Sequence, residues 1–204
     1  MKLFRHLFLT GLLLSLLLAA CDNGDRFSFL RPNDVILAFG DSLTHGTGAS
    51  EDKSYPAQLE KMLARTVINA GVPGEVTAEG LKRLPGLLDK HDPDMLILCH
   101  GGNDILRRLD RETTIANLKA MIGEAQARDI PVILVSVPQF GLFIDSAPFY
   151  QEIADEMKIF CQNSIVSEIL TDKSLKSDTI HPNADGYFQM AEGIADLLKE
   201  HGAI

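Results

Sequence analysis

The chain has 204 residues, of which 46% are apolar and 23% charged, and this composition excludes an intrinsically disordered protein. The length suits a single domain with a substantial core. The formal net charge is −9 without a cluster of Lys and Arg, so we expect no nucleic-acid partner, because phosphate contacts need cations.

Residues 1–21 have the form of a secretory signal peptide, with a basic start, an apolar run and small residues at the end. The ending LAAC resembles the bacterial lipobox, in which the cysteine, here Cys21, is lipidated. We therefore expect a membrane-anchored lipoprotein of the bacterial periplasm. Residues 22–33 would form a tether to a domain at 34–204. An ordinary signal peptide with a chance cysteine, or a retained anchor helix, is the alternative.

Short apolar runs then alternate with longer amphipathic ones. The short runs are typical of strands covered on both faces, and they lie at 34–39, 66–70, 94–99, 131–137 and, more weakly, 164–169. Helical periodicity is found at 54–64, 77–91, 113–127, 148–160 and 183–200. Pro85 and Gly86 should bend or split the second helix. This alternation predicts a parallel sheet with helices on both faces.

Two cysteines remain in the predicted domain. Cys99 ends an apolar strand pattern and Cys161 ends a helix pattern. We expect both to be free, buried thiols rather than a disulfide. They are too few and too far apart for a zinc site, and we expect no metal.

Polar residues follow the predicted strands, and in a parallel sheet ligands bind beyond the carboxyl ends of the strands. Ser42 lies in the turn GDS after the first strand. A serine hydroxyl needs a neighbouring base to act as a nucleophile, and the base needs an orienting partner. His181 is the best candidate base, with Asp178 three residues before it, just ahead of the last helix. These three residues predict a catalytic triad.

Acyl transfer also needs donors for the oxyanion. The candidates are the backbone N–H groups of Ser42 and Gly71 and the side-chain amide of Asn103, each after a different strand. His45 and His100 lie beside these residues in the sequence and would line the pocket or support it. The loop FGLFI follows the fourth strand and could line an acyl-binding groove, and its candidate substrate-binding residues are Phe140, Leu142 and Phe143.

Four blocks together resemble the SGNH (GDSL-type) hydrolase family: FGDSLTHG, NAGVPGEVT, HGGND and DTIHPN. The resemblance is greatest to the small periplasmic branch of thioesterases, arylesterases and lysophospholipases. It implies a flavodoxin-like three-layer α/β/α sandwich with strand order 2-1-3-4-5. It also implies a serine esterase without cofactor or metal, with Ser42 as nucleophile, His181 as base and Asp178 as orienting residue. Its expected substrate is a small-molecule or lipid ester.

Three other functions stay open from the sequence. A carbohydrate O-deacetylase would use the same residues but would need little apolar lining. A non-catalytic binding lipoprotein could keep the fold, although the complete set of catalytic residues argues against it. A flavin-binding module is the third alternative, and the loop after the first strand fits its phosphate site only in part.

Overall fold

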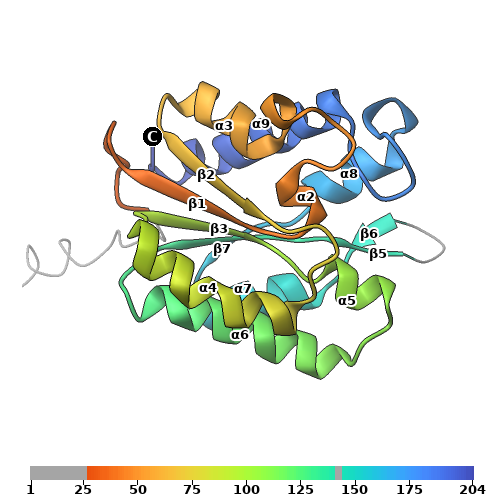
Figure 1. Cartoon of the computed structure of the whole chain (residues 1–204), viewed down its shortest axis with the longest axis horizontal. Coiled ribbons are helices and arrows are strands. Elements are labelled where there is room, and N and C mark those ends of the chain that lie inside the picture. The colour runs from red at the N-terminus through yellow and green to blue at the C-terminus, as the bar shows by residue number, and fades with distance from the viewer. Residues whose placement is uncertain (1–26, 141–143) are drawn as a thin grey trace, which may run out of the picture.

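The computed structural model describes residues 27–140 and 144–204. Its centre is a parallel five-stranded sheet in the order β2-β1-β3-β4-β7 (Figure 1). The strands are β1 (Val35–Gly40), β2 (Thr66–Gly71), β3 (Met95–Cys99), β4 (Val132–Val135) and β7 (Phe160–Gln162). The predicted topology is confirmed, because the first strand lies between the second and the third, and the fourth and fifth follow outward.

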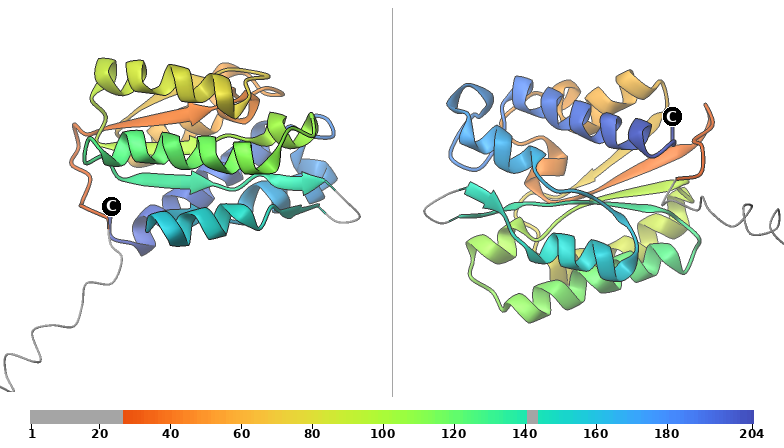
Figure 2. Two further views of the ribbon diagram at one scale, coloured as in Figure 1. Left: turned by 90° about the horizontal axis from the view of Figure 1, so that it is seen from below. Right: turned by 180° about the vertical axis from the view of Figure 1, so that it is seen from behind.

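Helices cover both faces of the sheet (Figure 2). One layer contains α3, α8 and α9, and the other contains α4, α6 and α7 (Figure 1). The helices are α2 (Ser42–His45), α3 (Tyr55–Leu63), α4 (Thr77–His91), α5 (Gly102–Leu106), α6 (Arg111–Gln126), α7 (Phe149–Met157), α8 (Ile165–Thr171) and α9 (Ala184–Glu200). Short 3-10 turns lie at Glu51–Lys53 and Lys173–Leu175, and β5 (Pro138–Phe140) and β6 (Ile144–Ser146) form a separate antiparallel pair.

The core lies between the sheet and both helix layers, and β3 and β4 are buried along their whole length. Three fully buried tyrosines connect the helices to the segments that follow β1 and β3. Their hydroxyls bond to Thr44 Oγ1 (Tyr55, 3.2 Å), to the His100 carbonyl (Tyr150, 2.8 Å) and to the Thr47 carbonyl (Tyr187, 2.8 Å). The core therefore holds the loops at the carboxyl end of the sheet in place.

The position predicted for the fifth strand is wrong. Residues 165–171 form helix α8, and the fifth strand is the three-residue β7 just before it. Val166, Ile169 and Leu170 are the buried residues of this segment, and their spacing of three and four places them on one helical face. Helix α7 ends at Met157 because the next residue adopts a left-handed backbone conformation. Cys161 therefore belongs to β7 and is half-buried; it and the buried Cys99 are free thiols.

The sequence predicts that Pro85 and Gly86 bend or split the second helix, but helix α4 is not split there. It runs unbroken from Thr77 to His91, with the proline inside it. Leu84 and Leu88, one turn apart on either side of the proline, are both buried in the core. Their burial holds the two halves of the helix on the same surface, although Pro85 removes one backbone hydrogen bond.

The second half of the predicted tether packs against the domain. Phe27 and Leu30 are buried, and their N–H groups donate to the carbonyls of His201 and Ala203 after α9. The Phe27 ring lies 4.3 Å from that of Phe160, at the start of β7. The folded domain therefore begins by residue 27, and this segment joins the end of the sheet where the strands start. The predicted signal peptide, Cys21 and residues 22–26 lie outside the described residues.

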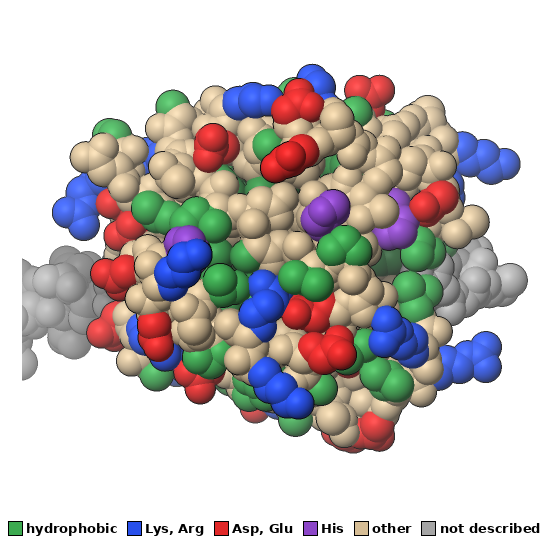
Figure 3. All heavy atoms as spheres, viewed as in Figure 1, with side chains coloured by type: hydrophobic (Ala, Val, Ile, Leu, Met, Phe, Trp, Pro, Cys, Tyr) green, Lys and Arg blue, Asp and Glu red, His purple; other side chains and the backbone are tan. Residues whose placement is uncertain are grey.

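The face shown in Figure 3 carries interspersed acidic and basic side chains, with small groups of hydrophobic side chains between them. Neither sign of charge dominates it, so this face offers no single-sign surface that would attract a polyelectrolyte. Within residues 27–140 and 144–204, no helix combines the length and the apolar character needed to cross a bilayer.

Candidate active site

Ser42 lies at the sharp turn from β1 into the short helix α2. The Asp41 side chain caps this helix by accepting a hydrogen bond from the Leu43 N–H at 3.1 Å. Gly40 ends the strand, and a Cβ on it would overlap the Cys99 carbonyl oxygen of neighbouring β3. The absence of a side chain at position 40 lets β1 and β3 stay paired up to the turn, which places the Ser42 hydroxyl beyond the end of the sheet.

Ser42, His181 and Asp178 form a continuous chain of hydrogen bonds. His181 Nε2 lies 3.0 Å from Ser42 Oγ, although the two residues are 139 positions apart. His181 Nδ1 lies 2.8 Å from Asp178 Oδ2. With Nδ1–H donated to the carboxylate, Nε2 is free to accept the serine proton. The structure thus brings the three residues of the predicted triad together.

The loop before α9 is built to hold this histidine. Asp178 Oδ1 accepts hydrogen bonds from the N–H groups of Ile180 (2.8 Å) and His181 (2.9 Å), while its other oxygen faces the ring. Desolvation raises the pKa of Asp178, but the hydrogen bonds from the His181 ring and the two N–H groups outweigh it and lower the pKa below its usual value. Asn183 closes the loop by capping α9 with hydrogen bonds from Asp185 and Gly186 N–H.

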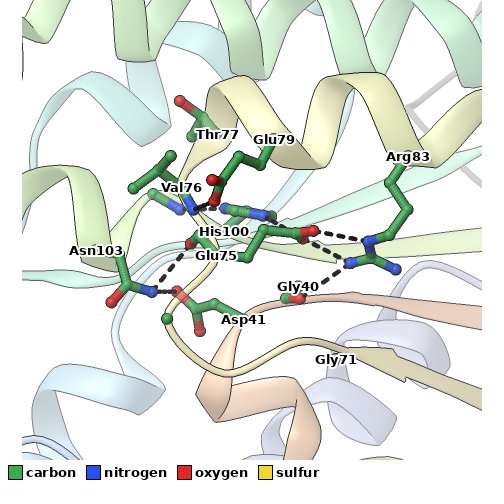
Figure 4. A network of polar contacts seen from close by, with 12 residues as sticks. Gly40, Asp41, Gly71, Glu75, Val76, Thr77, Glu79, Arg83, His100 and Asn103 are labelled. Atoms are coloured by element: carbon green, nitrogen blue, oxygen red, sulfur yellow. Dashed lines mark hydrogen bonds and ion pairs between the residues drawn. The ribbon is translucent and has the colours of Figure 1, made fainter.

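Asn103 lies in α5, directly after β3, beside the serine turn. Its side-chain amide donates to the Glu75 carbonyl at 3.0 Å and to Asp41 Oδ2 at 3.2 Å (Figure 4). Asp41 is buried, and this desolvation raises the pKa of its carboxyl. The amide therefore lies between the loop after β2 and the turn that carries Ser42, beside the Ser42 hydroxyl in the same cleft.

Gly71 does not occupy the position predicted for it. Its N–H donates to Asn69 Oδ1 at 3.0 Å, and it lines a separate hollow with His45 and Gly46. β2 continues through Gly71, which pairs with Gly40, and the backbone of His45 packs so closely that a Cβ would overlap it. Figure 4 shows Gly71 at the end of its strand, apart from Asn103. This glycine allows close packing and supplies no donor to the cleft.

The second glycine of GVPG, Gly74, fits the donor position better. It has a φ of 81°, and its N–H has no hydrogen-bond partner in the described part of the chain. Its carbonyl accepts from Arg107 Nη2 at 2.7 Å, and the next carbonyl, of Glu75, is the one that Asn103 binds. A positive φ favours glycine, which explains the residue type at position 74.

His100 is a supporting residue that the sequence had left undecided. Its ring is fully buried, with Nε2 3.1 Å from Glu75 Oε2 and Nδ1 3.0 Å from the Gly101 N–H. Arg83 binds the same carboxylate with two hydrogen bonds. His45, by contrast, is exposed and lies outside the cleft around Ser42. Among the residues the structure covers, no group of three His, Cys, Asp or Glu side chains is placed to hold a metal ion.

A model of the GDSL-like lipase/acylhydrolase family matches residues 38–188. The chain belongs to this family. An arylesterase of Vibrio mimicus is 29% identical over 203 residues, covering 93% of this chain and 98% of the relative. The thioesterase 1/protease 1/lysophospholipase L1 of Escherichia coli K12 is 30% identical over 174 residues, covering 81% and 84%. The solved structure of AlinE4, an SGNH-hydrolase family esterase, matches with a TM-score of 0.63 at 31% identity, covering 85% of this chain and 98% of that one.

The resemblance predicted from the four sequence blocks is thereby confirmed. The matched range contains the loops after β1, β2 and β3 and the Asp178–His181 loop as well as the sheet. The likeness therefore extends beyond a shared fold to the segments that carry the chemistry, which sets the flavin-binding alternative aside. The relatives are named for the hydrolysis of ester bonds, and this member of the GDSL family is an ester hydrolase.

The cleft of this GDSL-family member is lined mainly by apolar side chains. Ser42, Asn103 and His181 lie in it together with Leu43, Leu106, Val137, Pro138, Leu170 and Ile180. The predicted groove residues fall close by in sequence: Phe140 ends β5, which also contains the cleft residue Pro138. Leu142 and Phe143 lie outside the described residues.

Proposed function

We propose that the chain is a serine esterase in which Ser42 attacks the ester carbonyl, His181 acts as base and Asp178 orients the histidine. The observation that carries this proposal is the unbroken sequence of hydrogen bonds from Ser42 Oγ through the imidazole to the Asp178 carboxylate. A nucleophile, a base and an orienting acid within bonding distance are the parts that acyl transfer requires.

In the first step, Ser42 Oγ bonds to the carbonyl carbon while its proton passes to His181 Nε2. The imidazolium then gives this proton to the leaving oxygen or sulfur, and an acyl group remains on Ser42. Water attacks the acyl-enzyme by the same route: His181 takes a proton from it, the acid departs, and the proton returns to Ser42. The carboxylate of Asp178 stabilises the positive charge that the ring carries in both halves.

The negative charge on the carbonyl oxygen needs donors that are in place before it forms. We propose the N–H groups of Ser42 and Gly74 and the amide of Asn103 for this role. Asn103 Nδ2 donates one proton to Glu75 O at 3.0 Å and the other to Asp41 Oδ2 at 3.2 Å, and the second of these would turn to the oxyanion as it forms. Gly74 is included because its N–H has no partner in the described residues and it adjoins the carbonyl that Asn103 binds.

The lining of the cleft favours esters with an apolar acyl chain. Six apolar side chains surround the catalytic groups, and a chain placed against them would lose contact with water. Long-chain acyl thioesters and lysophospholipids carry such a chain, an aryl ester brings an apolar aromatic group, and relatives are named for acting on these classes. A carbohydrate O-deacetylase would gain little from this lining, because an acetyl group is too small to contact it.

A series of aryl esters from acetate to palmitate tests both the activity and the cleft. Wild-type protein is expected to hydrolyse esters with medium acyl chains best. Leu106, which lines the cleft and is 44% exposed, can be changed to Asp without opening the core. Leu106→Asp should lower kcat/KM on the medium-chain esters by roughly 10-fold, since a charge replaces an apolar contact, and leave the acetate ester nearly unchanged.

Leu109→Asp is the matched control, because this leucine is 47% exposed and lies outside the cleft. It should leave kcat/KM unchanged across the series. Equal losses on acetate and medium-chain esters in Leu106→Asp would contradict the apolar subsite. Absence of hydrolysis of every ester by the wild-type protein would contradict the proposed activity itself.

We also propose that the mature chain is anchored to a membrane in the bacterial periplasm through acyl groups on Cys21. Five residues separate this cysteine from Phe27 and could reach at most about 20 Å. Phe27 lies at the end of the sheet where the strands begin, whereas the cleft opens at the other end. The anchor and the cleft would thus lie at opposite ends of the domain, which leaves the cleft open to substrates from the aqueous side.

Changing the cysteine tests this anchor directly. Cys21→Ser should move the protein from the membrane fraction to the soluble fraction of the cells that make it, because the thiol that takes the acyl chain is gone. Hydrolysis of a soluble aryl ester, measured in detergent, should be the same for both proteins. Membrane attachment that persists in Cys21→Ser would contradict lipidation at this residue.

A further inference from the structure

Behind Asn103 lies a cluster of three charged or ionisable side chains that do not line the cleft: Glu75, Arg83 and His100 (Figure 4). Arg83 binds the Glu75 carboxylate with two hydrogen bonds, Nε to Oε1 at 2.8 Å and Nη2 to Oε2 at 2.6 Å. His100 Nε2 lies 3.1 Å from the same Oε2. Glu75 and His100 are buried, whereas Arg83 is partly exposed. Two side chains from different parts of the chain therefore hold one buried carboxylate.

The hydrogen bonds assign the protonation of each group. The Gly101 N–H donates to His100 Nδ1, so Nδ1 carries no proton and the ring must donate from Nε2 to Glu75. Desolvation raises the pKa of Glu75, but the hydrogen bonds from His100 and Arg83 outweigh it and lower the pKa to about 2. The cluster therefore contains a carboxylate, a guanidinium and a neutral imidazole, and its charges cancel.

The backbone of Glu75 connects this cluster to the catalytic cleft. Its carbonyl accepts the hydrogen bond from Asn103 Nδ2, while its side chain is held by His100, the residue directly after β3, and by Arg83 of α4. His100 also receives the Gly101 N–H at the start of α5, the helix that carries Asn103. The acceptor that orients the amide and the helix that carries it are thus fixed by one set of contacts.

Arg83 extends the cluster to the strand before the nucleophile. Its guanidinium lies 4.1 Å from the centroid of the Phe39 ring, and its Nη2 is 3.4 Å from the Gly40 carbonyl, two residues before Ser42. Phe39 in turn lies beside the His100 ring, with 5.8 Å between centroids. The cluster therefore contacts segments at the ends of β1, β2 and β3 together.

We propose that Glu75, His100 and Arg83 are positioning residues for the Asn103 amide, which they hold in the orientation that the oxyanion needs. This inference rests on the proposed function, since it concerns a donor for the same reaction. None of the three lines the cleft around Ser42, so each would act through Asn103. A displacement of a catalytic group by about 1 Å can cost as much as 10²-fold in rate, which sets the scale of the effect.

The test is a double-mutant cycle with Asn103→Ala. Both oxygens of the Glu75 carboxylate accept hydrogen bonds, from Arg83 and from His100 Nε2. In Glu75→Gln one oxygen becomes an NH₂ donor, which would face one of these donors and lose the hydrogen bond. His100 cannot offer Nε2 as an acceptor instead, because its Nδ1 already accepts from the Gly101 N–H. We expect kcat on an aryl ester to fall roughly 10-fold with KM unchanged within about 2-fold. In the Asn103→Ala background the same substitution should change kcat by less than about 2-fold, because the group that it positions is absent.

Arg83→Lys is the second variant, and it keeps the experiment decisive if Glu75→Gln does not fold. Arg83 is partly exposed, and a lysine keeps the charge but cannot bind both carboxylate oxygens at once. The same pattern is expected: a kcat loss that disappears without Asn103. Glu124→Gln is the matched control, since it removes the charge from a surface ion pair between Glu124 of α6 and Arg128 just after it, and it should leave kcat unchanged in both backgrounds.

Equal kcat losses with and without Asn103 would overturn the proposal, because the cluster would then act independently of the amide. A lowered melting temperature with unchanged kcat would also overturn it and leave a purely structural role. Both outcomes differ from a failure of the proposed function, which would show as an inactive wild-type protein or as an active Ser42→Ala variant.

Discussion

Replacing Ser42 by alanine is expected to lower kcat for ester hydrolysis by about 10⁶-fold, and His181→Ala should cost nearly as much. The two side chains act as one unit, because the hydroxyl is a poor nucleophile unless the imidazole 3.0 Å away takes its proton. The double variant should therefore be no slower than Ser42→Ala. Each single variant and the double variant should still hydrolyse the ester faster than the uncatalysed reaction in water, since Asn103 and the apolar cleft are unchanged.

Initial rates on a medium-chain aryl ester, with each variant purified away from any host esterase, measure this effect. Asp178→Ala should lose less activity, because Asp178 is 52% exposed and water can replace part of its hydrogen bonding to His181. His45→Ala is the matched control: this histidine is three residues from Ser42 on the same short helix, yet exposed and outside the cleft. Full activity in Ser42→Ala, or losses that multiply in the double variant, would contradict the mechanism.

The arrangement of the proposed triad could be predicted because each of its three residues is marked by a local sequence pattern. Ser42 follows a strand in a Gly-Asp-Ser turn, and Asp178 and His181 are near enough to meet through one short loop. The structure adds the reason that this spacing works, namely that the backbone N–H of His181 binds the same carboxylate as its ring. Parallel topology then brings both segments to one end of the sheet.

The glycine that we propose as an oxyanion donor could not be chosen in the same way. Residues 71–74 contain two glycines, and the sequence does not say where β2 ends. Pairing of Gly71 with Gly40 and its close contact with His45 decide that the first glycine belongs to the strand. Both contacts join segments that are distant in the sequence, so the pattern of residues around Gly71 alone does not reveal them.

The position of the fifth strand and the contacts of His100 could not be predicted, for related reasons. Residues 160–162 form a strand too short to show a periodicity of its own, and it borders helical patterns on both sides. The role of His100 depends on Glu75 and Arg83, which the loop after β2 and helix α4 bring to it from 25 and 17 positions away. Patterns within a single segment identify elements and turns but not the buried polar contacts between them.

Asn103→Ala is expected to lower kcat by about 10²–10³-fold, equivalent to roughly 2.7–4 kcal/mol of barrier, with KM nearly unchanged. The amide contributes only when negative charge develops on the carbonyl oxygen, so its loss should appear in the transition state and not in binding. The substitution also leaves the buried Asp41 with the Leu43 N–H as its remaining donor among the described residues. A loss of about 1–3 kcal/mol in the free energy of unfolding should accompany the kinetic effect.

Asn117→Ala separates the two consequences. Asn117 lies on α6, half-buried, and its amide donates to Thr77 Oγ1 at 3.1 Å, away from the cleft. This variant should lose a similar or smaller amount of stability with kcat unchanged, whereas Asn103→Ala should lose both. Denaturant unfolding and steady-state kinetics on the same preparations make the comparison. If Asn103→Ala kept its kcat, the amide would serve only to satisfy Asp41 and Glu75, and the oxyanion would depend on backbone donors alone.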